Sequence, residues 1–280
     1  MKHSIFDAKS AAGNSMKSPY SITHSEAIRR LRADLSPFLV HLTRSGTVKL
    51  WADIIGQSKD EFLEIDAEES LKRIIRSSRI EAKSPFGYFN FKIPYRKMNG
   101  NLINASSRVQ RSWLRSVCFT EAPVDTIGFQ CQFHPARKCQ FERFGLVFFE
   151  SPVRRAGGNP IFYVDSENAE LRSSLDVIPA SIVCEGFAPM MPFFECFGKP
   201  IFSGGGNVKE IDFRWEREWR IVGDFEFSKL DVAFGLCPEE HISGFESLVS
   251  RNFLFVDPFW SKERLVEKLS QDERLKKLLG

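Results

Sequence analysis

The feature that most constrains this chain is its phenylalanine content, with 27 phenylalanines against only 4 tyrosines. Many of them stand in short runs beside leucine or valine, as in Phe144–Phe149. Aromatic and β-branched residues in runs of this length favour buried strands over exposed stacking surfaces. A chain of 280 residues is also long enough to bury a large core. We therefore expect one globular domain built around a Phe-rich sheet.

Composition also narrows the location of the protein. No apolar run reaches the roughly 20 residues that a membrane-spanning helix needs. The N-terminal segment carries Lys2, Asp7, Lys9 and Lys17 and lacks the apolar stretch of a secretory signal. We expect a cytoplasmic protein with no membrane partner, in which the six cysteines are reduced thiols.

The nearest pattern to a metal site is Cys131-x-x-His134 followed by Cys139. Zinc sites usually combine two such half-motifs, and only one is present. The sequence therefore predicts no metal site. A zinc-containing nucleic-acid binder built on these three residues stays as a minor alternative.

Charge is distributed unevenly along the chain. Residues 72–115 hold eleven Lys or Arg and one acidic residue, Glu81, whereas residues 121–257 hold twenty-one acidic and thirteen basic residues. Aromatic residues lie among the cations, so the stretch 72–115 has the composition of a phosphate or nucleic-acid binding segment. The alternative is a solvated helix face and loop whose charge is neutralised by acidic residues in the fold.

Periodicity gives a coarse map of the elements. Strands are predicted at 38–43, 115–120, 144–149, 161–164, 213–222, 232–236 and 253–256. Helices are predicted from Thr47 through Ile55, after an N-cap at Asp66, as a turn at 123–127, over 238–249 and after Pro258. Because strands and helices are interspersed without regular βαβ alternation, we predict the α+β class with a mixed or antiparallel sheet.

The predicted strand at 213–222 alternates strictly between polar and apolar residues. Glu216, Glu218 and Arg220 would share one face of that strand. Two carboxylates on one strand face raise each other's pKa, which is typical of catalytic pairs. A solvent-facing strand, with its charges balanced by Arg217 and Arg220, explains the same pattern.

Several short segments carry a further signal through their order and spacing. They are HLTR at 41–44 followed by a helix with Ile54-Ile55, SVCFTE at 116–121, FGLVF at 144–148, GNPIFYV at 158–164 and EWRI at 218–221. In this order they resemble the AbiGi-type abortive phage-infection proteins. The chain is also similar to the broader set of bacterial defence and toxin proteins with an ADP-ribosyltransferase-like fold.

The resemblance implies a split α+β sheet around a cleft that holds NAD, with peripheral helices. It also implies three parts of the chain. Residues 1–35 would form an N-terminal arm with a short helix, and residues 36–257 would form the ADP-ribosyltransferase-like domain. Residues 258–280 would form a C-terminal helix packed on that domain.

The resemblance also implies which residues bind the cofactor. His41 or Arg44 on the first strand would grip a ribose or phosphate of NAD. Thr120 on a middle strand, with Ser116 behind it, would shape the nicotinamide pocket.

The same resemblance points to a catalytic carboxylate on a late strand. Glu218 matches this position best, and Glu216 supplies the paired-glutamate spacing of one transferase branch. A fixed carboxylate suits this chemistry, because cleavage of the bond to nicotinamide gives an oxocarbenium-like transition state.

Two classes of function are consistent with these features. The first is an antiphage or toxin enzyme that transfers ADP-ribose from NAD to a nucleic-acid or protein acceptor, presented by residues 72–115. The second is a catalytically inactive antitoxin or sensor that binds a partner toxin or a phage component.

Overall fold

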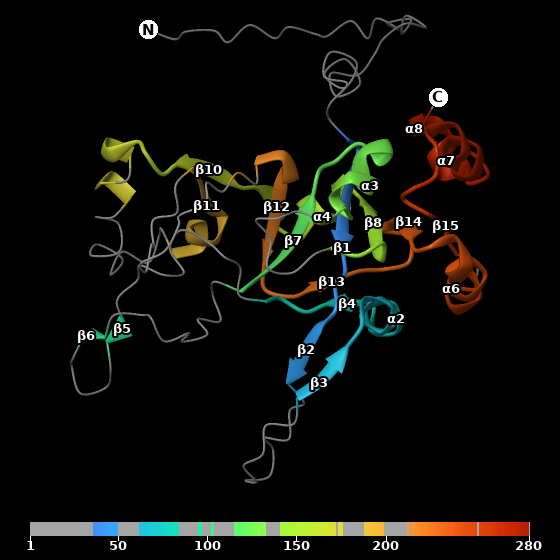
Figure 1. Cartoon of the computed structure of the whole chain (residues 1–280), viewed down its shortest axis with the longest axis horizontal. Helices are drawn as coiled ribbons and strands as arrows, with labels where there is room; N and C mark the ends of the chain where they lie inside the picture. Colours follow the sequence, from blue (N-terminus) through green and yellow to red (C-terminus); the bar gives the residue numbers. More distant parts are fainter. Residues whose placement is uncertain are drawn as a thin grey trace, which may run out of the picture. The chain divides into compact units, whose positions relative to one another are not determined.

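The computed structural model of the chain describes residues 36–49, 62–83, 95–96, 102–103, 115–132, 141–171, 173–175, 188–198, 212, 214–250 and 252–279 (Figure 1). By its contacts the chain divides into residues 1–33 and a compact unit of residues 34–280. The arm and helix predicted over 1–35 lie outside the described residues.

A sheet of seven described strands forms the centre of the compact unit. Its strands are β1 (Phe38–Leu42), β7 (Ser116–Thr120), β8 (Gly145–Phe149), β9 (Asn159–Pro160), β12 (Glu218–Val222), β14 (Val232–Leu236) and β15 (Phe255–Val256). They follow one another in the order β15-β14-β8-β1-β7-β12-β9. The strands from β15 to β12 are labelled in Figure 1. Neighbouring strands are antiparallel except β14 and β15, which run parallel. The predicted α+β class with a mixed sheet is therefore confirmed.

Further described strands pair two by two. These pairs are β2 (Gly46–Lys49) with β3 (Phe62–Ile65), β4 (Arg79–Ile80) with β13 (Phe225–Glu226), β5 (Tyr95–Arg96) with β6 (Leu102–Ile103), and β10 (Phe162–Asp165) with β11 (Phe194–Phe197).

Helices flank the strands. Among the described residues the α-helices are α2 (Ala67–Ser77), α3 (Ile127–Gln130), α4 (Glu150–Arg155), α6 (Ile242–Leu248), α7 (Lys262–Leu269) and α8 (Glu273–Leu279). The described 3-10 helices are η3 (Val124–Thr126), η4 (Ala188–Phe193), η5 (Arg214–Glu216) and η6 (Glu239–His241). None of the described helices combines the length and the apolar character needed to cross a bilayer.

The start of α2 follows directly from the sequence. Asp66 is extended, and its side chain accepts a hydrogen bond from the backbone N–H of Glu69 at 2.7 Å. Glu68 and Glu69 then lie in the first turn, where acidic side chains interact favourably with the positive end of the helix dipole. The predicted N-cap is confirmed.

The helix predicted from Thr47 through Ile55 is wrong over its first residues. Thr47 and Val48 belong to β2, and Val48 is paired with Leu63 of β3. Two consecutive β-branched residues favour an extended backbone, and pairing with β3 provides hydrogen-bond partners for that backbone. Residues 50–61 lie outside the described part of the chain.

The C-terminal segment is also more divided than predicted. After Pro258 the chain forms two helices, α7 and α8, instead of one. Asp272 lies between them, and its carboxylate accepts a hydrogen bond from the backbone N–H of Arg274 at 2.9 Å. Such a local bond begins a new helix and so competes with continuation of α7.

Both faces of the central sheet are buried, because successive residues of a strand point to opposite sides. On one side, here called the α2 face, Leu39 and Leu146 pack with Leu71 of α2 and Phe245 of α6. On the other, here called the α7 face, Val40 and Val147 pack with Leu265 of α7. The C-terminal helices thus contribute directly to the core of residues 34–280.

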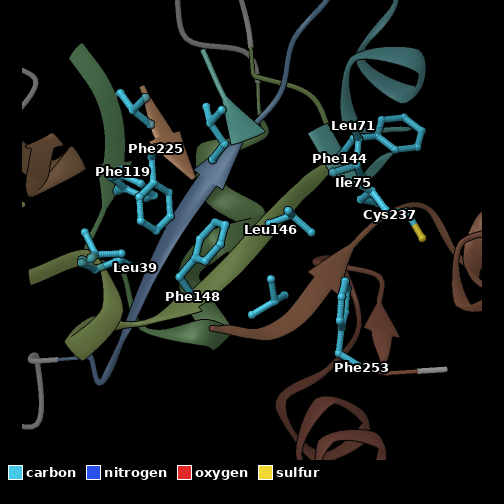
Figure 2. Packing of buried hydrophobic residues seen from close by; sticks show 14 of the residues in the cluster. Leu39, Leu71, Ile75, Phe119, Phe144, Leu146, Phe148, Phe225, Cys237 and Phe253 are labelled. Atoms are coloured by element: carbon cyan, nitrogen blue, oxygen red, sulfur yellow. The ribbon is translucent and has the colours of Figure 1, made fainter. Parts of the chain in front are cut away.

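Phenylalanines dominate the α2 face (Figure 2). The rings of Phe119, Phe148 and Phe225 meet edge to face, with centroid separations of 5.3–5.8 Å. Such pairs stabilise a core beyond the area that they bury. The expected Phe-rich buried strands are therefore present.

We expect Phe148→Ala to lower the free energy of unfolding by about 3–5 kcal/mol, because it opens a cavity at the centre of this cluster. Chemical denaturation monitored by circular dichroism measures the loss. The matched control is Phe129→Ala, whose ring is 67% exposed and should change stability little. Equal effects of the two substitutions would contradict the assigned core.

Candidate functional site

The strand that carries the predicted glutamates begins later than the sequence pattern indicates. Residues 214–216 form the 3-10 helix η5, and Arg217 has a positive φ of 46° before β12 begins at Glu218. The carboxylate of Asp212 accepts a bond from the backbone N–H of Arg214 at 3.0 Å, and this local contact stabilises the turn. The prediction that Glu216 shares a strand face with Glu218 is therefore wrong.

Glu218 and Arg220 do share one face of β12, and they form a bidentate ion pair. Arg220 donates from Nε to Oε1 of Glu218 at 2.8 Å and from Nη2 to Oε2 at 2.9 Å. Arg220 is only 2% exposed and the Glu218 side chain 14%. Both carboxylate oxygens of Glu218 are thus held by a buried guanidinium.

A second carboxylate completes the cluster. Arg220 Nη2 also donates to Glu195 of β11 at 2.8 Å, and its Nη1 donates to the carbonyl of Pro192 at 2.6 Å. Burial raises the pKa of Glu195 to about 7, although the nearby Arg220 lowers it. Burial lowers the pKa of Arg220, but Glu218 and Glu195 more than offset this and keep it charged. One cation therefore faces two carboxylates, and we call Arg220, Glu218 and Glu195 the buried triad.

Cys118 and Tyr163 adjoin the triad. Cys118 is paired directly with Arg220 across β7 and β12, and burial, followed by Glu218, raises the pKa of its thiol. The hydroxyl of Tyr163 accepts a hydrogen bond from the backbone N–H of Glu218 at 3.0 Å, and burial raises its pKa as well. Cys118 is thus a neutral thiol and lacks the thiolate that a cysteine nucleophile needs.

Thr120 and Ser116 lie on the same face as the triad. Thr120 is paired with Glu218, and Ser116 lies two residues before Cys118 on β7. The Thr120 hydroxyl donates to the carbonyl of Glu216 and accepts a bond from Gln130 Nε2 at 2.8 Å. The structure therefore places Thr120 beside Glu218, with the Thr120 hydroxyl bonded to protein groups.

His41 lies on the opposite face. Val40 is paired with Thr120, so the next residue along β1 points toward the α2 face, where the His41 ring meets Phe119 at 5.8 Å. Its Nδ1 is 2.8 Å from the carbonyl of Cys118, and burial lowers the pKa of the imidazole to about 4. His41 is a neutral structural residue and does not converge with Glu218.

β1 and β7 separate beyond this point. Among the described residues their ladder is one pair, Val40 with Thr120, and Lys83 exchanges two backbone hydrogen bonds with Ser116 where β1 would continue. Arg44 is exposed just after β1. Burial, followed by the charge of Arg44, lowers the pKa of Lys83, so two cations lie near each other where the strands diverge.

Much of the basic stretch 72–115 that the structure describes is neutralised within the chain. Lys72 pairs with Glu68 and Arg73 with Glu69 on α2. Arg79 pairs with Asp224 of the acidic half. Over these residues the interpretation as a solvated, internally balanced face is supported; most of residues 84–114 lie outside the described part.

The half-motif Cys131-x-x-His134 lies only partly within the described residues. Cys131 belongs to them, and its Sγ lies 3.4 Å from the carbonyl of Glu142. His134 and Cys139 lie outside them. The described residues contain no group of three or more His, Cys, Asp or Glu side chains that could hold an ion.

Comparisons with known proteins add no assignment. No protein-family model, no curated protein and no solved structure matches the chain.

Sequence reasoning missed three members of this site. Glu195 reaches the triad from β11 and stands in no motif. Tyr163 reaches it from β10 and lies in the segment GNPIFYV, but nothing in that segment marks it as a member of the site. Lys83 reaches Ser116 through backbone bonds that no side-chain pattern reports. Arg220 did have a signal, since it follows Glu218 by two residues on an alternating strand.

We expect Glu195→Gln to change how stability depends on pH. The native carboxyl titrates near pH 7 and the unfolded one near 4.5, so only the native state holds this proton between these values. Raising the pH through this window should therefore lower the free energy of unfolding of the parent protein, by up to about 3 kcal/mol. The free energy of unfolding of the Glu195→Gln variant should not fall in this way over the same pH range.

The comparison uses the difference between the two proteins at each pH. The buried His41 acts in the opposite direction, because its pKa falls from 6.5 to about 4 on folding and stability rises with pH between these values. This contribution is common to both proteins and cancels. Parallel profiles over pH 4.5–7 would contradict the assigned burial of Glu195.

Proposed function

We propose that the protein binds NAD on the α7 face of β1, β7 and β12, as an ADP-ribosyltransferase-like protein of phage defence. The observation that carries the proposal is the direct pairing of Thr120 with Glu218 on that face. These are the two positions that the resemblance assigns to the nicotinamide pocket and to the catalytic carboxylate. The order β1-β7-β12 supports it, because the three strands that carry or precede the assigned NAD-binding and catalytic residues are neighbours.

The phosphate end of the ligand is assigned to Arg44. The Thr43 hydroxyl contacts the carbonyl of Ala67 on the α2 side, so alternation along an extended chain directs Arg44 toward the α7 face. Arg44 lies four residues beyond Val40, or about 13 Å along the strand direction, and β12 is about 10 Å across from β1. This separation suits an elongated ligand with its phosphates at one end and a ribose at the other.

The charges fit the two ends of such a ligand. Arg44 and Lys83 have no ion-pair partner among the described residues, so a pyrophosphate would relieve their mutual repulsion. A fixed carboxylate at Glu218 would stabilise the positive charge that develops when the bond to nicotinamide breaks. The acceptor of ADP-ribose, a nucleic acid or a protein, is proposed to meet residues 72–115.

We expect Arg44→Ala to weaken NAD binding about tenfold, the effect of losing one charge-assisted contact. Isothermal titration calorimetry with NAD measures the change. The control is Arg73→Ala, an exposed arginine of α2 that pairs with Glu69 and should leave affinity unchanged. The proposal fails if the parent protein does not bind NAD at millimolar concentration, or if both variants bind like the parent.

A second candidate function has its own supporting observation. Because both oxygens of Glu218 are bound by Arg220, the carboxylate is already neutralised by a cation and is less able to stabilise another. This favours an inactive antitoxin or sensor that binds a partner toxin or a phage component and turns over no NAD.

Turnover separates the two functions. For the transferase we expect release of nicotinamide from NAD, and we expect Glu218→Gln to reduce it at least about a hundredfold, as loss of a key electrostatic group does. Glu216→Gln is the matched control, because Glu216 lies off the strand and should matter little. Thermal unfolding of both variants checks that they fold. Equal rates in the parent and Glu218→Gln would reject the catalytic assignment, whereas NAD binding without turnover would select the second function.

A further inference from the structure

A separate pocket of about 270 Å³ lies between the start of β8 and the ends of β14 and β15. Its lining residues are Cys131, Phe141, Glu142, Arg143, Phe144, Pro238 and Phe259. No residue of β7 or β12 is among them, so this pocket is separate from the paired Thr120 and Glu218.

The two charged side chains of this pocket, Glu142 and Arg143, are held by contacts with the rest of the chain and with neighbouring residues in the lining. Oε1 of Glu142 accepts bonds from the backbone N–H of Ser45 at 2.7 Å and from its hydroxyl at 2.6 Å. Nη1 of Arg143 donates to Asp257 at 3.1 Å, and its guanidinium lies 5.1 Å from the ring centre of Phe259. The side chains are therefore held in place before any ligand arrives.

Glu142 and Arg143 both keep donor or acceptor atoms that could bind a ligand. Glu142 Oε2 and the Nε and Nη2 groups of Arg143 make no hydrogen bond within the described part of the chain. Phe141, Phe144 and Phe259 add aromatic residues to the lining, and the ring of Phe259 is 51% exposed. The pocket thus combines aromatic walls, one free carboxylate oxygen and a free guanidinium edge.

This combination selects a class of ligand. A simple anion would be opposed by Glu142 and Asp257, and a metal ion would find too few ligand oxygens. A flat molecule with donors and acceptors on its edge suits both the rings and the polar atoms. Nucleobases have these properties, and proteins bind them by stacking on aromatic side chains and by hydrogen bonds to the base edge.

We propose that this pocket binds a purine base, and guanine in preference to adenine. The N1–H and N2–H groups of guanine would donate to Glu142, and its O6 and N7 atoms would accept from Arg143, which is the usual pairing of arginine with guanine. Adenine offers one donor group, N6, and lacks the O6 acceptor, so it satisfies fewer of these atoms.

The test is calorimetric titration of the full chain with GMP, AMP and CMP. GMP should bind at least about tenfold more tightly than AMP, since each bidentate base contact discriminates by this order. Glu142→Gln should remove most of the preference for GMP. Phe259→Ala should weaken all binding, and because its ring is 51% exposed the substitution leaves the fold intact.

Two controls make the outcome specific. Phe129→Ala removes another exposed ring and should bind GMP like the parent, and so should Arg44→Ala, which distinguishes this pocket from the proposed NAD face. A short guanine-containing oligonucleotide tests the source of the base: tighter binding than GMP indicates a strand, and equal binding a free nucleotide. Equal affinity for GMP and AMP, no binding of GMP at millimolar concentration, or GMP binding unaffected by Glu142→Gln and Phe259→Ala would overturn the proposal.

Discussion

The buried guanidinium of Arg220 is the interaction on which the site depends. It joins β12 to Glu195 of β11 and to the carbonyl of Pro192 in η4, segments more than twenty residues away in the chain. Removing one partner of a buried ion pair leaves an uncompensated charge and typically costs about 3–5 kcal/mol. The same contact neutralises Glu218, the proposed catalytic carboxylate. If the protein is the proposed transferase, structure and activity therefore compete for one carboxylate.

Much of the fold could be predicted because local signals agreed with the tertiary structure. Phe-rich runs became buried strands, and Asp66 began α2. The prediction of a strand failed where a short-range hydrogen bond stabilised a different backbone conformation from the one that the alternating sequence pattern indicates. The bond from Arg214 to Asp212 stabilises a 3-10 helix over three residues of the alternating segment, 214–216, and this takes Glu216 off the strand. Alternation alone does not report such a bond.

Part of the site was predictable, because side chains along a strand alternate between its two faces. Ser116, Thr120 and Glu218 share a face because register and even spacing place them there. His41 and Arg44 are three residues apart, so in an extended chain they point to opposite faces and only one of them can serve this face. Glu195 was beyond prediction, because its position depends on how β11 packs against the sheet. Pairings between distant segments leave no local pattern in the sequence.

The most direct test of the proposed NAD site is an experimental structure of the protein soaked with NAD. We predict density for the ligand along the α7 face, with its pyrophosphate beside Arg44 and Lys83 and its nicotinamide ribose beside Glu218 and Thr120. We also predict that Arg220 keeps its bond to Glu195. NAD bound elsewhere on the chain, or a triad that fills this face and leaves no room for the ligand, would contradict the proposal.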